Sequence, residues 1–128
     1  MKRLLLIPLL ALSACATGYH SQGFTGGYRD YMIGPDTASV AVTGNGFTSF
    51  DKAEQIWIRR AADITLQHGY RYFVVETANS VPGINPAGLL TPGITSIIRM
   101  TNDPNSGNGL RVFDAYYIRS STSNMSGI

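Results

Sequence analysis

The chain has 128 residues, with ten Lys and Arg, eight Asp and Glu, and a single cysteine. Residues 1–14 hold two of the ten basic side chains, so the rest of the chain has eight of each sign and a formal net charge of zero. A neutral domain has no general electrostatic attraction for nucleic acid, and we expect no nucleic-acid partner. One cysteine forms no intrachain disulfide, so packing in one modest core must stabilise the fold.

The N-terminus resembles the signal of a bacterial lipoprotein. A short basic segment precedes an apolar run over residues 4–12, which is too short to remain as a membrane-spanning helix. The sequence LSAC at residues 12–15 then resembles the lipobox, in which an apolar residue and two small residues precede a cysteine. The resemblance implies that residues 1–14 are cleaved off and that Cys15 carries a diacylglycerol, which anchors the protein to a membrane. An ordinary secretory signal with a chance cysteine is the alternative.

The segment that follows the cysteine is small, polar and Gly-rich. We expect residues 15–27 to comprise the lipidated cysteine and a flexible tether, whose residues span about 20 Å on average and about 40 Å when extended. In lipoproteins of bacteria with two membranes, an aspartate directly after the cysteine commonly marks retention in the inner membrane. Ala16 occupies that position here, so the resemblance implies an outer-membrane location facing the periplasm.

Runs of β-branched and aromatic residues predict five strands. They are expected at residues 28–33, 37–43, 70–77, 94–100 and 110–119. Turn signals between the first two strands and between the last two predict that each of these pairs forms a hairpin.

One helix is predicted between the second and third strands, over residues 48–68. Apolar residues recur at spacings of three and four from Ala53 to His68, which gives a continuous stripe for packing against a sheet. Either Thr48 or Ser49 is suited to cap the start of this helix. Gly69 is suited to the position just after its end, where a positive φ is common.

The order β-β-α-β-loop-β-β predicts an α+β fold. We expect a single small domain over residues 28–119, with a mostly antiparallel five-stranded sheet and one helix packed on one face. The polar residues 120–128 are expected to form a disordered tail.

Several sequence blocks are similar to a family of small proteobacterial lipoproteins of uncharacterised function. These blocks are GYRDY at residues 27–31, GNGFTS at residues 44–49 and RAADITLQHGYRYFVV at residues 60–75, together with the lipobox LSAC. The resemblance implies a lipoprotein with this order of elements. It brings no established activity, so it implies no catalytic residues.

The residues predict no catalytic site, no metal site and no cofactor. The two histidines, His20 and His68, are not at the spacing of zinc ligands. Glu76 and Asp114 lie on predicted strands and could meet as an acid pair, but an interstrand arginine such as Arg71 is the commoner partner. Because no nucleophile, base and orienting group can be assembled, we expect that the protein is not an enzyme.

Two features predict a contact surface. The first is a set of tyrosines at the predicted strands, of which Tyr70, Tyr72 and Tyr116 are the candidates for the surface. The second is the proline-rich segment 80–93, which is expected to be an irregular loop carrying Ile84, Leu89 and Leu90. These apolar residues either are exposed, as in a protein or membrane contact, or pack down onto the sheet.

The expected function is therefore that of a lipid-anchored cell-envelope protein that binds another envelope protein or helps to maintain the envelope, without catalysis. The alternative is a periplasm-facing domain that binds a small ligand or peptidoglycan. That alternative predicts a concave, tyrosine-lined pocket with converging polar groups such as Asn45, Arg71 and Arg111.

Overall fold

The computed structural model describes residues 19, 21, 26–45, 48–84 and 86–123. The predicted signal, Cys15 and residues 124–128 of the predicted tail lie outside the described residues.

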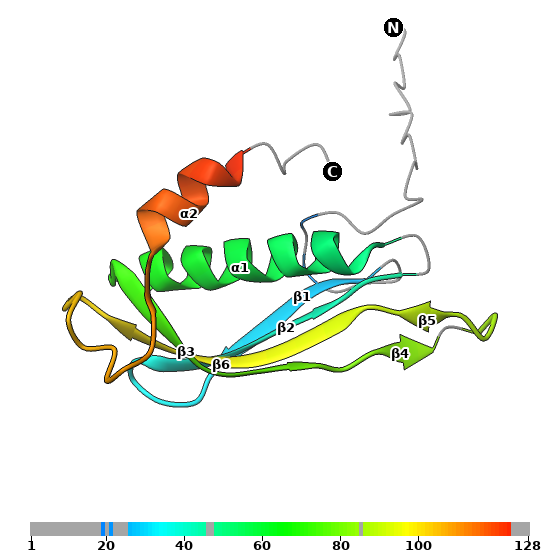
Figure 1. Ribbon diagram of the computed structural model, residues 1–128, viewed down its shortest axis with the longest axis horizontal. Coiled ribbons are helices and arrows are strands. Elements are labelled where there is room, and N and C mark those ends of the chain that lie inside the picture. Colours follow the sequence, from blue (N-terminus) through cyan, green and yellow to red (C-terminus); the bar gives the residue numbers. More distant parts are fainter. Residues whose placement is uncertain (1–18, 20, 22–25, 46–47, 85, 124–128) are drawn as a thin grey trace, which may run out of the picture.

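A five-stranded sheet forms the centre of the fold (Figure 1). The strands, in their order across the sheet, are β1 (Gly27–Met32), β2 (Thr37–Thr43), β6 (Gly93–Thr101), β3 (Tyr72–Ser80) and β7 (Val112–Asp114). Every neighbouring pair is antiparallel. The α+β class and the five-stranded antiparallel sheet are therefore confirmed, as is the hairpin of the first two strands.

Helix α1 (Phe50–Gln67) covers one face of this sheet. Ser49 caps its start, because the Ser49 side chain accepts a hydrogen bond from the backbone N–H of Lys52. Gly69 follows its end with a φ of +83°, as expected. The buried stripe of α1 packs on residues of the three central strands to form one core, whose members include Ile56, Ala61, Val40, Ile98 and Phe73.

The prediction of a strand over residues 110–119 is wrong in its second half. Only β7 is extended, and helix α2 (Ala115–Ser121) follows it directly. The Asp114 carboxylate ends the strand because it accepts a hydrogen bond from the Tyr116 N–H and caps α2. Ala115 and Ile118, three residues apart, are buried in the core. The run of aromatic residues is thus a short amphipathic helix, and the first two residues of the predicted tail belong to it.

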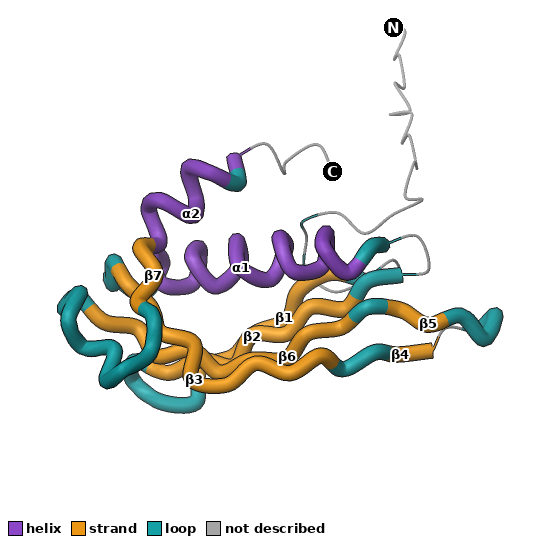
Figure 2. Tube along the Cα trace, viewed as in Figure 1, coloured by secondary structure: helices purple, strands orange, loops and turns teal. Residues whose placement is uncertain are grey.

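The pairing of the last strand also differs from the prediction. β7 pairs with β3 at the edge of the sheet and not with β6, which lies between β2 and β3. The predicted hairpin of the last two strands is therefore absent from the described residues. Figure 2 shows the loop after β6 passing around the end of the sheet before it reaches β7.

The proline-rich segment is more regular than predicted. Strands β4 (Gly83–Ile84) and β5 (Leu90–Thr91) form a two-stranded antiparallel ribbon that continues the β3–β6 hairpin. Val81 donates a backbone hydrogen bond of 2.8 Å to the Gly93 carbonyl. A Cβ at Gly93 would lie 2.2 Å from the Val81 carbonyl oxygen, so only glycine permits this approach. We call residues 81–92 the arm; it extends from the sheet past the first turn of α1 (Figure 2).

Candidate interaction surfaces

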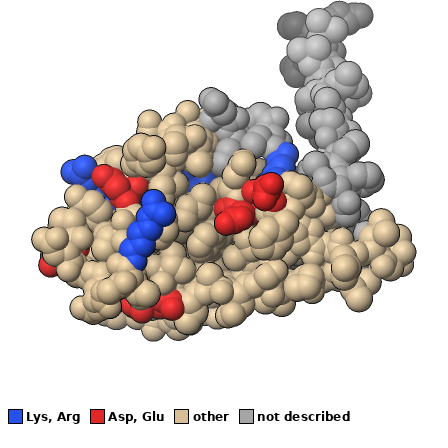
Figure 3. Space-filling view, in the orientation of Figure 1, with Lys and Arg blue, Asp and Glu red and all other residues tan. Residues whose placement is uncertain are grey.

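The arm presents apolar side chains to solvent. Ile84, Leu89 and Leu90 are 72%, 57% and 71% exposed. Residues 77–98 contain no acidic or basic residue, and the arm carries no charged atoms in the space-filling view (Figure 3). Of the two outcomes left open by the sequence, exposure of this segment is the one observed. Clustered exposed apolar residues are typical of a surface that contacts a partner or a membrane.

The predicted tyrosine cluster forms only in part, at the opposite end of β3 from the arm. The Arg71 guanidinium lies 5.4 Å from the ring centre of Tyr72 and 5.6 Å from that of Tyr116. Tyr70 is half-buried and packs against the core, where its backbone N–H donates to the Thr65 carbonyl. The six predicted contact residues therefore do not share one continuous surface.

Arg71 also pairs with Asp114 at 3.2 Å. Partial burial acts to raise the pKa of Asp114, but the hydrogen bond from Arg71 and those from the N–H groups of Tyr116 and Tyr117 outweigh it and lower that pKa. Glu76 has a different partner, because it accepts a 2.7 Å hydrogen bond from Arg99. The two carboxylates thus have separate arginine partners, and the hypothetical acid pair is not formed.

The pocket required by the ligand-binding alternative does not assemble from the predicted residues. Asn45 follows β2 and Arg71 precedes β3, and the strand register puts these two positions at opposite ends of the sheet. Arg111 lines a different hollow, beside α1. The three polar groups do not converge.

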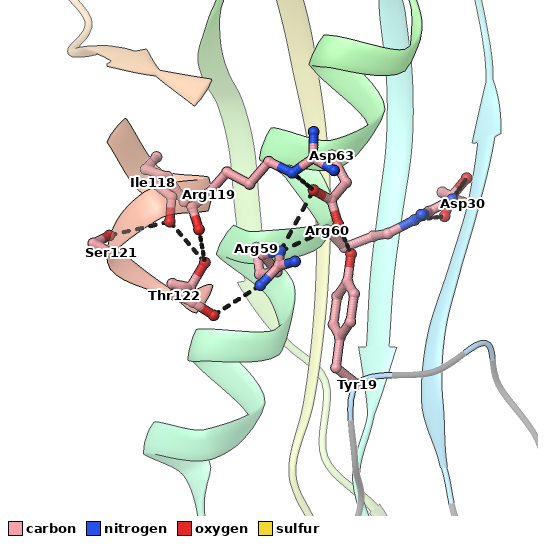
Figure 4. Close-up of polar contacts among 9 residues, drawn as sticks. All are labelled: Tyr19, Asp30, Arg59, Arg60, Asp63, Ile118, Arg119, Ser121 and Thr122. Carbon is pink, nitrogen blue, oxygen red and sulfur yellow. Dashed lines mark hydrogen bonds and ion pairs between the residues drawn. The ribbon is translucent and has the colours of Figure 1, made fainter. Parts of the chain in front are cut away.

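A buried polar network joins three distant segments (Figure 4). Asp63 on α1 is only 9% exposed and accepts a hydrogen bond from the Tyr19 hydroxyl. The same carboxylate lies 3.3 Å from Nε of Arg59 and 3.6 Å from Nε of Arg119 on α2. Arg59 additionally donates to the Thr122 carbonyl at 2.7 Å. The spacing of four residues between Arg59 and Asp63 on a helix predicts an ordinary surface pair, but no local signal in the sequence marks the other two partners of Asp63.

Tyr19 belongs to the segment that was predicted to be a flexible tether, yet it is docked on the domain. Its ring lies 5.0 Å from that of Tyr28 and packs against the core. Burial, and then the hydrogen bond to Asp63, raise the pKa of Tyr19, so its hydroxyl remains a proton donor. Next to it, Arg60 binds Asp30 on β1 at 2.6 Å. The prediction of free flexibility is therefore wrong for this residue.

We expect Asp63→Asn to lower the free energy of unfolding by about 1–3 kcal/mol, because Arg59, Arg119 and Tyr19 lose a shared, nearly buried anion. The measurement is urea denaturation followed by the fluorescence of Trp57. Asp114→Asn is the matched control, since it removes the charge from a pair whose arginine is largely exposed and should cost less than about 1 kcal/mol. Equal losses in the two variants would contradict a central role for Asp63.

A groove runs between α1 and one edge of the sheet. One hollow of about 520 Å³ is lined by residues of α1 and by Arg111 and Phe113. A second hollow, of about 170 Å³, is lined by residues of α1 and by Ala78, Asn79 and Ser80. Glu54 and Trp57 line both hollows, so the two lie next to each other along α1. In Figure 3, charged side chains of both signs flank a hollowed, uncharged strip of this surface.

The comparisons with known proteins add no assignment. Models of protein families, curated protein sequences and solved structures all yield no match to this chain. Within the part of the chain that the structure describes, neither helix combines the length and apolar character needed to cross a membrane.

Proposed function

We propose that this protein is a lipid-anchored lipoprotein of the cell envelope, which faces the periplasm and binds an envelope protein without catalysis. The lipid on Cys15 would hold the chain at a membrane, and the arm would supply the contact. The observation that carries the proposal is the apolar, uncharged surface of the arm, at Ile84, Leu89 and Leu90.

The construction of the arm supports a binding role. The pairing of Gly83 with Thr91 and of Ile84 with Leu90 satisfies backbone groups within the ribbon, so the side chains project from a regular element. A preorganised ribbon loses less conformational entropy on binding than a mobile loop does. The apolar side chains of the arm do not contribute to the core, which is complete without them.

The polar groups of the domain support a structural rather than a chemical role. Asp30, Asp63, Glu76 and Asp114 each form an ion pair with arginine. His68 has a structural contact too, since its Nδ1 lies 2.9 Å from the Ile64 carbonyl oxygen.

The proposal is tested by photo-crosslinking in intact cells. A photoreactive amino acid replaces Ile84 or Leu89, and Thr95 is the control, because it is exposed on the same hairpin but lies outside the arm. We expect one dominant protein adduct from positions 84 and 89 and none from position 95, identified by mass spectrometry. Adducts with lipid or peptidoglycan alone, or the same adducts from all three positions, would contradict a protein partner for the arm.

A further inference from the structure

Strand β3 has one edge that the described strands leave largely uncovered. β6 pairs with β3 along its whole length, but β7 pairs only with Tyr72–Val74 on the other side. The sheet position next to residues 77–80 is therefore unoccupied by any described strand. This surface is independent of the arm and of the function proposed for it.

The backbone groups of this edge face outward. Val81 donates to the Gly93 carbonyl on the β6 side. In an antiparallel ladder, alternate residues direct their backbone groups to the same neighbour, so Asn79 and Thr77 also face β6. Ala78 and Ser80 consequently direct their N–H and C=O groups toward the open side. Such groups are a template for one more strand.

The edge lies beside the groove described above, and the groove has walls suited to side chains. Ala78 is opposite Ser96 and Ser80 is opposite Ile94, so both side chains lie on the face that α1 covers. Trp57 closes this side, and its indole N–H is fixed by a 2.7 Å hydrogen bond to the Ser96 hydroxyl. Every second side chain of an added strand would thus enter the groove between α1 and the sheet.

The rim of the groove is acidic at one end. Asp51 and Glu54 line the larger hollow from the first turns of α1, together with the single cation Arg111, and neither carboxylate forms an ion pair with another described residue. Phe50, which is 45% exposed, lines the smaller hollow together with Glu54. Carboxylates at the rim and aromatic side chains in the hollows together match a strand that carries both apolar side chains and a basic one.

We propose that the open edge of β3 and the adjoining groove bind an extended peptide segment with a basic side chain, by addition of a strand to the sheet. The backbone of the peptide would pair with Ala78 and Ser80. Its apolar side chains would contact Trp57 and Phe50, and its basic side chain would pair with Glu54. In this mode, backbone hydrogen bonds supply affinity and the groove supplies specificity.

The ends of the site limit its length. The register of β3 shifts between Val75 and Thr77, where a bulge interrupts the regular edge. β7 occupies the same sheet position from Val112 onward. At the other end, Pro82 has no N–H to offer. The regular edge is therefore four to five residues long, which suits a short linear segment of a partner.

A second copy of this chain fits the edge less well. Antiparallel pairing of two β3 edges would place the two α1 helices on the same face, with their first turns close to the symmetry axis. Asp51 and Glu54 of both copies would then lie near one another, so four carboxylates would gather at the junction against one Arg111 from each copy. Like charges at such a junction oppose pairing, whereas a basic peptide is attracted.

The test uses the full-length chain in detergent micelles and a phage-displayed library of random nine-residue peptides. We expect selected peptides to alternate β-branched or aromatic residues with polar ones and to contain a lysine or arginine. Hydrogen exchange should slow at the backbone N–H of Ala78 and Ser80 when a selected synthetic peptide is bound. The absence of an enriched pattern, or unchanged exchange at both positions, would overturn the proposal.

Three variants distinguish specific backbone pairing from nonspecific adhesion. Ala78→Pro removes an outward N–H and leaves the β6 ladder intact, so the affinity should fall about tenfold or more. Ala78→Ser is its matched control, because it keeps the N–H and should change the affinity less than about twofold. Glu54→Gln should weaken binding at low salt more than at high salt. Equal affinities of Ala78→Pro and Ala78→Ser, both folded by circular dichroism, would contradict strand addition.

Discussion

Replacement of Phe73 by alanine should lower the free energy of unfolding by about 3–5 kcal/mol, the range for removal of a fully buried aromatic side chain. Phe73 has no exposed surface. It lies on β3, where it belongs to the core under α1 and is paired with Phe113 of β7. Its ring stacks on that of Phe113 with 5.2 Å between the ring centres. Because domains of this size are stable by about 5–15 kcal/mol, we expect a large shift of the urea denaturation midpoint.

Phe50→Ala provides the matched control for this measurement. The chemical change is the same, but Phe50 is about half exposed at the first position of α1. We therefore expect a loss below about 1 kcal/mol. The burial pattern indicates a core centred on β3. A similar shift of the urea denaturation midpoint in both variants would contradict that position of the core.

Cys15→Ser should release the protein from the membrane altogether, because the proposed lipid is attached through the thiol and a serine hydroxyl is not modified in its place. The anchoring free energy of the acyl chains is then lost as a whole. The measurement is metabolic labelling with a fatty acid, combined with fractionation of membrane and soluble protein. We expect neither label nor membrane retention in the variant.

Ser13→Ala is the control for that experiment, since it changes a neighbouring residue of the lipobox but keeps it small. It should remain labelled and bound to the membrane. If Cys15→Ser protein is still labelled and membrane-bound, the interpretation of residues 12–15 as a lipobox is wrong.

The parts of the fold that follow from local periodicity could be predicted from the sequence. The alternation of residues 37–43 matches β2 at both ends, and α1 begins and ends within two residues of its predicted bounds. The error at residues 115–121 has a physical cause. Tyr116 and Tyr117 have strand propensity, but the N-cap at Asp114 and the packing of Ile118 on the core favour a helix. Tertiary contacts of this kind are not visible in a local pattern.

The candidate surfaces were predictable to different degrees. The apolar residues of the arm could be identified from composition alone, but their exposure depends on the ribbon formed by β4 and β5. The open edge of β3 could not be predicted, because it results from the strand order and from the brevity of β7. The contact of Tyr19 with Asp63 joins residues 44 positions apart, and no local signal marks it.

The docking of Tyr19 on α1 determines how far the domain can stand from a membrane if Cys15 carries the proposed lipid. Only four peptide units separate Cys15 from Tyr19, so the chain between them reaches at most about 14 Å. The chain from Cys15 to the start of β1 would reach about 40 Å if it were fully extended. If Cys15 carries the proposed lipid, the contact of Tyr19 with Asp63 would therefore hold the domain close to the bilayer, where other proteins attached to the same membrane would be its nearest neighbours.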